Sequence, residues 1–385
     1  MKTVLVIGGG IGGCVSALEF KKIGWEVTLV EGSSQLGAGL RTNFMDGHPY
    51  TFGPRHFLSH NEKTFNFLNS YVPLRRCSEH EFISYISEDE QFYNYPIHYD
   101  DINKMPNASQ IINEVNELEE IYRDTNYTIN SEIIKNPKFK VENYKEFWQK
   151  SVGNSLYSKF IEQYTKKMWM LNDETLIDDF TWSPKGVAIK KGPRAGWDNA
   201  ISAYPLALDG YNCIFDLTMK NINIIKNTKI NNIDLEKNSV CIQNEKKNYD
   251  IIINTTPLDT LFNNEYGELK FIGRNIEFLI LPCEFALPNN VYFSYYCGKQ
   301  PYTRIVEYKK FTQYKSKNTL ISLEYPSNNG RYYPMPIKEE REKFEKYNKL
   351  HNDKFFSIGR LGLYNYRYDI DDVIEQAIEV LDKVK

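Results

Sequence analysis

The chain lacks the features that mark metal enzymes, secreted proteins and membrane proteins. No apolar run reaches the roughly 18 residues that a membrane-spanning helix needs, and no signal peptide precedes the first predicted strand at Lys2. The six cysteines and six histidines are scattered without the spacing of zinc ligands or of a disulfide framework. We therefore expect reduced thiols, no metal site and a cytoplasmic protein that does not contact a membrane.

Charge of either sign is not in large excess. The net charge of −3 and the pI of about 6.2 argue against a general nucleic-acid binder. An anionic ligand would therefore need a local cluster of cations. The 385 residues exceed what one hydrophobic core usually organises, so two or three sub-domains are expected. The 28 tyrosines indicate either a polar ligand cleft or the codon bias of an AT-rich genome.

The N-terminus reads as a complete βαβ unit. Thr3–Ile7 is a short β-branched run typical of a buried parallel strand, and residues 14–23 form a helical stretch that Gly24 ends. Glu26–Val30 predicts a second strand, which leads into Glu31.

The residues between the first strand and the helix form a dinucleotide-binding motif. Residues 8–13 (GGGIGG) fit the pattern G-x-G-x-x-G. The glycines allow a tight turn, a close approach of the backbone to a pyrophosphate and close helix packing, and the helix N-terminus favours the phosphates. Glu31 stands where an acid accepts hydrogen bonds from the adenosine ribose. The predicted contacts are Gly8, Gly10, Ile11, Gly13 and Glu31.

Two further segments favour FAD over NAD. Residues 32–42 (GSSQLGAGLRT), with Gly39 and Arg41, resemble the second glycine-rich turn of glutathione-reductase-like and amine-oxidase-like flavoproteins. Gly359-Arg360, followed by Asp369 before a helix, resembles the distal FAD motif of the same superfamily. We expect all five of these residues, namely Gly39, Arg41, Gly359, Arg360 and Asp369, to contact FAD.

The remaining patterns predict an α/β fold in which the dinucleotide-binding domain is discontinuous. A Rossmann-like FAD-binding domain is expected from residues 1–75, 210–260 and 345–385. Residues 100–167 are expected to form a helical insertion, because apolar residues from Phe147 to Tyr164 recur near every fourth position and suit one buried helix face. An antiparallel substrate-binding sheet domain is expected from residues 76–99, 168–209 and 261–344.

Several segments, in order along both halves of the chain, resemble the UDP-galactopyranose mutase family, which includes dTDP-fucopyranose mutases. The most specific is residues 301–307 (PYTRIVE). The others are residues 53–57 (GPRHF), 92–97 (FYNYPI), 164–169 (YTKKMW), 324–326 (EYP), 332–334 (YYP) and 359–361 (GRL), with Tyr364, Tyr366 and Asp369.

The resemblance implies a reaction without net redox change. In that family, N5 of reduced FAD attacks the anomeric carbon of a nucleotide-sugar, expels the nucleoside diphosphate and allows the ring to reclose in its furanose form. A diphosphate leaving group needs cations and phenolic donors. The implied catalytic residues are Arg304, Arg55, His56, Tyr325 and Tyr366. The implied substrate-binding residues are Trp169, Lys185, Arg304, Tyr325, Tyr333 and Tyr366.

The chain departs from the family pattern at three places. Arg55 stands where the family has a flavin-facing histidine, so either Arg55 takes that contact or His56 does. Met170 replaces the glycine after the loop tryptophan. The arginine of the family's mobile loop is absent, and Lys185 in SPKG or Arg194 in KKGPR is the candidate replacement.

These departures leave the substrate open between UDP-galactopyranose, dTDP-fucopyranose and UDP-N-acetylgalactopyranose. The resemblance also implies an external reductant such as NAD(P)H and a homodimer. The main alternative is an FAD-dependent oxidase or dehydrogenase of the amine-oxidase type, which would not explain residues 301–307. A flavin-binding protein without catalysis is a further alternative.

Overall fold

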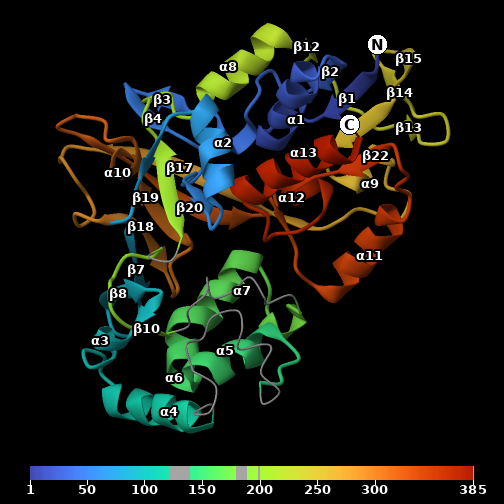
Figure 1. Cartoon of the computed structure of the whole chain (residues 1–385). Coiled ribbons are helices and arrows are strands. Elements are labelled where there is room, and N and C mark those ends of the chain that lie inside the picture. Colours follow the sequence, from blue (N-terminus) through green and yellow to red (C-terminus); the bar gives the residue numbers. More distant parts are fainter. Residues whose placement is uncertain (122–138, 179–188, 198–199, 385) are drawn as a thin grey trace.

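A five-stranded parallel sheet forms the upper layer of the molecule (Figure 1). The computed structural model describes residues 1–121, 139–178, 189–197 and 200–384. The strand order is β12 (Asn223–Ile225), β2 (Glu26–Val30), β1 (Thr3–Ile7), β16 (Ile251–Asn254), β22 (Phe355–Ser357). Because these strands come from three distant parts of the chain, the predicted α/β class and the discontinuous Rossmann-like domain are confirmed. The residue boundaries proposed for the three domains stay a prediction.

The central strand β1 is buried on both faces, as its β-branched composition predicts. Val4 and Val6 join one hydrophobic cluster with α1 (Ile11–Lys22), α8 (Asn212–Asn221) and α13 (Ile370–Val384). Leu5 and Ile7 point the other way because successive strand residues alternate between faces. They join a second cluster, whose further elements are α9 (Leu258–Leu261), α11 (Lys338–Asn348) and the antiparallel strands β13 (Ile233–Asp234) and β14 (Ser239–Ile242). The exposed strand β15 (Glu245–Asn248) pairs with β14.

Much of the chain between residues 76 and 344 forms a seven-stranded sheet (Figure 1). Its neighbouring strands are antiparallel except for β18 and β7, which pair in parallel, so the sheet is mixed rather than wholly antiparallel as expected. Its order is β21 (Tyr333–Pro334), β17 (Phe271–Leu281), β20 (Thr319–Ser327), β19 (Arg304–Glu307), β18 (Val291–Tyr296), β7 (Glu81–Ile86), β8 (Gln91–Tyr95).

The helical part lies below the two sheets in Figure 1, and its apolar residues from Phe147 to Tyr164 are divided among several short helices. Gly153 has φ +87 and ends α5, and the Glu114 carboxylate accepts hydrogen bonds from the amide and hydroxyl of Ser155 just beyond. A glycine in this conformation cannot continue an α-helix. The elements are α4 (Ala108–Ile121), α5 (Tyr144–Val152), α6 (Asn154–Tyr157), a π-helical turn (Ser158–Glu162) and α7 (Gln163–Trp169).

Short elements connect these layers. They are β3 (Asn43–Met45), β4 (His48–Tyr50), β5 (Phe57–Ser59), α2 (Glu62–Tyr71), β6 (Leu74–Arg76), β9 (Ile97–His98), α3 (Tyr99–Ile102), β10 (Ile189–Lys190), β11 (Ile201–Pro205), α10 (Tyr308–Thr312) and α12 (Gly359–Gly362). Two single 3-10 turns lie at Ala38–Leu40 and Glu174–Leu176. None of the helices within the described residues is long and apolar enough to cross a bilayer.

Candidate functional site

The turn between β1 and α1 has the shape of a phosphate cradle. A Cβ at Gly13 would lie 1.9 Å from the carbonyl oxygen of Gly8, so only glycine allows the helix to approach the strand this closely. Gly10 caps α1 without a side-chain hydrogen bond, and a Cβ there would meet nothing within 4 Å. The space beside Gly10 is therefore open at the N-terminus of α1, where an anion would be stabilised by the helix dipole.

Glu31 is held beside this cradle by two backbone amides. Its Oε2 accepts a hydrogen bond from the Gly9 amide at 2.6 Å, and its Oε1 accepts one from the Ser33 amide at 2.7 Å. A carboxylate has about four acceptor positions, so it retains capacity for the hydroxyls of a ribose.

The second glycine-rich turn brings Arg55 close to the cradle. A Cβ at Gly39 would lie 3.1 Å from Nη2 of Arg55, and the Arg55 Nε donates to the Phe52 carbonyl at 2.9 Å. Arg41 instead pairs with Asp216 of α8 at 3.1 Å. The structure therefore brings Gly39 and Arg55 together and directs Arg41 toward α8.

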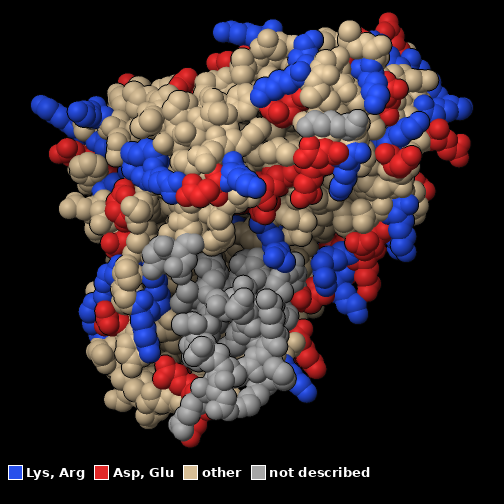
Figure 2. All heavy atoms as spheres, in the orientation of Figure 1, with Lys and Arg blue, Asp and Glu red and all other residues tan. Residues whose placement is uncertain are grey.

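A cavity of about 350 Å³ opens where the two sheets meet the helical part, and Figure 2 shows the surface hollowed at this junction. Its carboxylates are Glu324 and Asp369. The arginines in its wall are more numerous, namely Arg55, Arg274, Arg304, Arg360 and Arg367. In a chain of net charge −3, this is the local cluster of cations that an anionic ligand requires.

Arg304 is fixed in this wall by Glu324. The two residues are directly opposite on β19 and β20, and Nη2 of Arg304 lies 2.6 Å from Oε2 of Glu324, a carboxylate that is buried. Burial by itself would lower the pKa of Arg304, but the charges of Glu324, Tyr333 and Tyr295 and the hydrogen bond to Glu324 together hold the pKa well above its ordinary value. Arg304 therefore stays a cation.

Tyr333, Tyr366 and Trp169 form an aromatic corner around Arg360. The Arg360 guanidinium lies 5.6 Å from the ring centre of Tyr333 and 5.5 Å from that of Tyr366. The Trp169 ring packs edge-on against Tyr366 at 5.0 Å. Burial raises the pKa of Tyr366 to about 12, so its hydroxyl stays a hydrogen-bond donor near neutral pH.

The distal motif meets the cavity at the start of α13. Gly359 has φ +79, and its amide donates to the Gln376 side chain of α13 at 2.7 Å. Asp369 lies 3.9 Å from Arg360, and the Arg360 Nε donates to the Tyr368 carbonyl at 3.0 Å. Arg360 and Asp369 both line the cavity.

Arg55 and His56 both line the cavity, so the geometry keeps both as candidates for the flavin-facing position. The His56 ring lies among other rings, 5.0 Å from His80 and 5.6 Å from Phe311.

Two other predicted residues lie elsewhere, and a third falls outside the described residues. Tyr325 does not line the cavity: it follows Glu324 in β20 and therefore points to the opposite face, where its hydroxyl donates to Glu277 at 3.0 Å. Arg194 forms two bonds to Asp101, at 3.1 and 3.0 Å. Lys185 lies outside the described residues.

Arg274 is a cavity residue that the sequence did not reveal. Its side chain is buried, its guanidinium lies 4.7 Å from the ring centre of Tyr333, and its Nε has no hydrogen-bond partner among the described residues. The only signal was an arginine inside the buried end of a strand, after Phe271-Ile272-Gly273. Such a buried cation needs an anionic or polar partner.

The chain matches known proteins along its whole length. Residues 159–366 match the family model of UDP-galactopyranose mutase, and residues 6–71 match that of an NAD(P)-binding Rossmann-like domain. The chain is 23% identical over 400 residues to a probable UDP-galactopyranose mutase of Klebsiella pneumoniae, which covers 99% of this chain and 94% of that protein. It is 24% identical over 395 residues to a dTDP-fucopyranose mutase of Escherichia coli, with coverage of 98% and 97%.

Solved structures show the same fold. The crystal structure of a reduced UDP-galactopyranose mutase superimposes with a TM-score of 0.80 at 16% identity, covering 100% of this chain and 95% of that one. A putrescine oxidase bound to putrescine superimposes with a TM-score of 0.64 at 10% identity, covering 100% and 99%.

Proposed function

Because the chain belongs to the UDP-galactopyranose mutase family, we propose that it interconverts the pyranose and furanose forms of a nucleotide-sugar without net redox change. The observation that carries the proposal is the arginine-rich cavity beside the dinucleotide cradle. A cavity that must accept and return a nucleoside diphosphate needs fixed positive charge at the place where the leaving group gains negative charge.

We propose that the cofactor is FAD, active in its reduced form. The open space before α1, the glycines of the cradle and the Glu31 carboxylate fit an adenosine diphosphate. Gly39, Gly359 and Asp369 would contact the remainder of the cofactor, and Arg360 would lie near its ring system. When bound and reduced, FAD supplies the nucleophile for the anomeric carbon.

The chain's own residues would hold the leaving group. Arg304 is a permanent cation in the cavity wall, and the Tyr366 hydroxyl supplies a neutral donor beside it. Burial would raise the pKa of Tyr333, but the charges of Arg55, Arg274 and Arg304 lower it below its ordinary value. Arg274 adds a second buried cation on the Tyr333 side. Arg55 or His56 would face the reduced flavin, and a guanidinium there favours the anionic reduced form.

Trp169 would complete the substrate side of the cavity. Lys185, which lies outside the described residues, is proposed as the phosphate-binding cation, and Tyr325 is proposed to act only after a rearrangement that turns its side chain toward the cavity. We propose UDP-galactopyranose or dTDP-fucopyranose as substrate, with UDP-N-acetylgalactopyranose as the third candidate.

The test is to follow each sugar nucleotide by anaerobic chromatography with the protein oxidised and then reduced by dithionite. We expect one of them to be converted to its furanose isomer only by the reduced protein. Tyr366→Phe should lower turnover at least 10-fold, whereas Leu279→Ala, an exposed change in β17, serves as the matched control. Reoxidation of the flavin by substrate without isomerisation would instead support an oxidase of the amine-oxidase type.

The proposed partners follow from the same family. We propose an external reductant such as NAD(P)H, a homodimer and a cytoplasmic setting. Anaerobic bleaching of the flavin by NADPH and the mass measured by light scattering would test the first two.

A further inference from the structure

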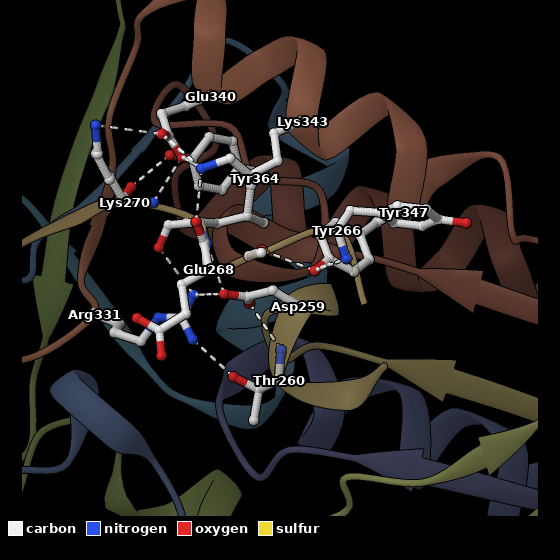
Figure 3. Close-up of polar contacts among 12 residues, drawn as sticks. Asp259, Thr260, Tyr266, Glu268, Lys270, Arg331, Glu340, Lys343, Tyr347 and Tyr364 are labelled. Carbon is white, nitrogen blue, oxygen red and sulfur yellow. Dashed lines mark hydrogen bonds and ion pairs between the residues drawn. The ribbon is translucent and has the colours of Figure 1, made fainter. Parts of the chain in front are cut away.

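A polar network outside the cavity lining is built on two buried carboxylates (Figure 3). Asp259 and Glu340 are both fully buried. Asp259 pairs with Arg331, and Glu340 lies 2.9 Å from Nζ of Lys343. A buried carboxylate is tolerated when it is paired and hydrogen-bonded, and both conditions are met here.

The same carboxylates fix a short stretch of backbone just before β17. Asp259 accepts a hydrogen bond from the Leu269 amide at 2.8 Å, and Glu340 accepts one from the Lys270 amide at 2.8 Å. The Lys270 carbonyl, on the other side of that residue, accepts a hydrogen bond from the Tyr364 hydroxyl. Lys270 is therefore held through both its amide and its carbonyl.

The Tyr364 hydroxyl is the junction of this network with the cavity. Besides donating to the Lys270 carbonyl, it accepts a hydrogen bond from the Met335 amide at 3.2 Å. The ring is buried between Phe271 and Phe344, with ring centres 5.1 and 5.7 Å away. Tyr364 also has φ +46, a left-handed conformation that is unfavourable for tyrosine, so its contacts must hold it there.

Each of the three segments joined by this hydroxyl carries a cavity residue. Tyr364 stands four residues after Arg360 and two before Tyr366. Met335 stands two residues after Tyr333, and Lys270 leads into β17, which carries Arg274. One hydroxyl therefore joins the turn that carries Arg360 and Tyr366 to the strands that carry Tyr333 and Arg274.

We propose that Tyr364 is a positioning residue, whose hydroxyl sets Arg360 and Tyr366 against Tyr333 for the reaction. The inference rests on the proposed mutase function, since it assigns those three residues to the substrate and cofactor. Without the hydroxyl, Lys270 and Met335 keep their own hydrogen bond of 3.2 Å, but the turn is released from both. A displacement of about 1 Å in a cavity of this kind lowers turnover by up to about 100-fold.

Tyr347 provides a matched control in the same network. It is also fully buried, and its hydroxyl likewise donates to one backbone carbonyl, of Gly267 at 2.8 Å, and accepts from one amide, of Tyr266 at 2.9 Å. Those partners lie in a loop that contributes no residue to the cavity wall. Tyr347→Phe therefore removes an equivalent pair of hydrogen bonds without releasing Arg360 or Tyr366.

The experiment compares Y364F and Y347F in the full chain with FAD bound. Both should lower Tm by a similar few degrees. Only Y364F should lower kcat for the accepted sugar nucleotide, by about 10- to 100-fold. Equal kcat values for Y364F and the unaltered protein, or equal losses in the two variants, would overturn the proposal.

A second measurement does not depend on the reaction. Trp169 packs against Tyr366, so a shift of the turn changes the emission of this tryptophan. Its contribution is isolated by subtracting the spectrum of the same variant that also carries W169F. We expect a changed Trp169 emission in Y364F and an unchanged one in Y347F. An unchanged emission in both would refute the positioning role even if the protein isomerises no sugar nucleotide.

Discussion

Arg304 and Glu324 are directly opposite each other on neighbouring antiparallel strands, and their charged atoms are 2.6 Å apart in the wall of the cavity. The pair leaves the guanidinium charged but fixed, with its Nε not engaged by any described residue. Arg304 is therefore preorganised to bind an anion.

Removing one member of this pair should cost more stability than removing both. R304M leaves Glu324 as an unpaired buried carboxylate, and we expect it to lower the free energy of unfolding by about 3 kcal/mol. The double variant R304M/E324L should recover most of that loss, because no buried charge is left. Urea unfolding of the single and double variants measures the coupling, and strictly additive losses would contradict the prediction.

Replacing Met170 by glycine should raise the free energy of unfolding, whereas glycine at most exposed helix positions lowers it. It ends α7 with φ +52, a conformation that glycine adopts without the cost of a side chain. We expect Met170→Gly to raise the free energy of unfolding by about 0.5–1 kcal/mol. Met219→Gly, at an exposed position within α8, is the control and should lower it by about 1 kcal/mol. Destabilisation by both changes would show that the left-handed conformation costs Met170 little.

Asp371 should make stability fall as pH rises. Burial, reinforced by the neighbouring charge of Asp372, raises the pKa of Asp371 from 3.8 to about 7 in the folded chain. Between these values the folded state holds a proton that the unfolded state has lost, so stability decreases from about pH 4 to pH 7. Asp371→Asn should therefore be more stable than the unaltered protein at pH 8 but not at pH 4. Unfolding curves at both pH values test this, with Asp353→Asn as a control that removes an exposed carboxylate.

Lys167 should be essential for the turn that precedes Arg304. Its Nζ donates to the carbonyls of Tyr296, Gly298 and Gln300 at 2.8, 3.0 and 2.8 Å, which uses all three ammonium protons. We expect Lys167→Met to lower the free energy of unfolding by about 2–4 kcal/mol, because three carbonyls lose a charged donor. Lys299→Met, at an exposed position of the same turn, should change it by less than about 0.5 kcal/mol. Similar effects of the two changes would argue against the carbonyl contacts.

Local patterns predicted the dinucleotide cradle and the terminal helix because both depend on neighbouring residues. The strand, glycines and helix of residues 3–22 follow from sequence order alone, and the helix expected after Asp369 is α13, which begins at Ile370. Arg304, Tyr333 and Tyr366 were selected from the family motifs, and the structure brings all three to one cavity.

The features that the sequence did not reveal depend on which face of a sheet a side chain occupies and on contacts between distant parts of the chain. Glu324 and Tyr325 are adjacent in β20, and neighbouring strand residues point to opposite faces of the sheet. A motif that spans both residues does not tell which of them faces the cavity. Arg274 became visible only when β17 was seen to pass beside Tyr333. The break at Gly153 was hidden because apolar residues keep a spacing near four across α5 and α6.

The order of strands in the parallel sheet also constrains how the protein can fold during its synthesis. β2 pairs with β12, about 190 residues later, and β16 pairs with β22 near the end of the chain. At about 5–20 residues per second, the ribosome reaches β12 roughly 10–40 s after β2, so nascent β2 waits that long for its outer partner. Such exposed strand edges are prone to aggregation. We therefore expect chaperones to bind the N-terminal segment until the last strand has been synthesised.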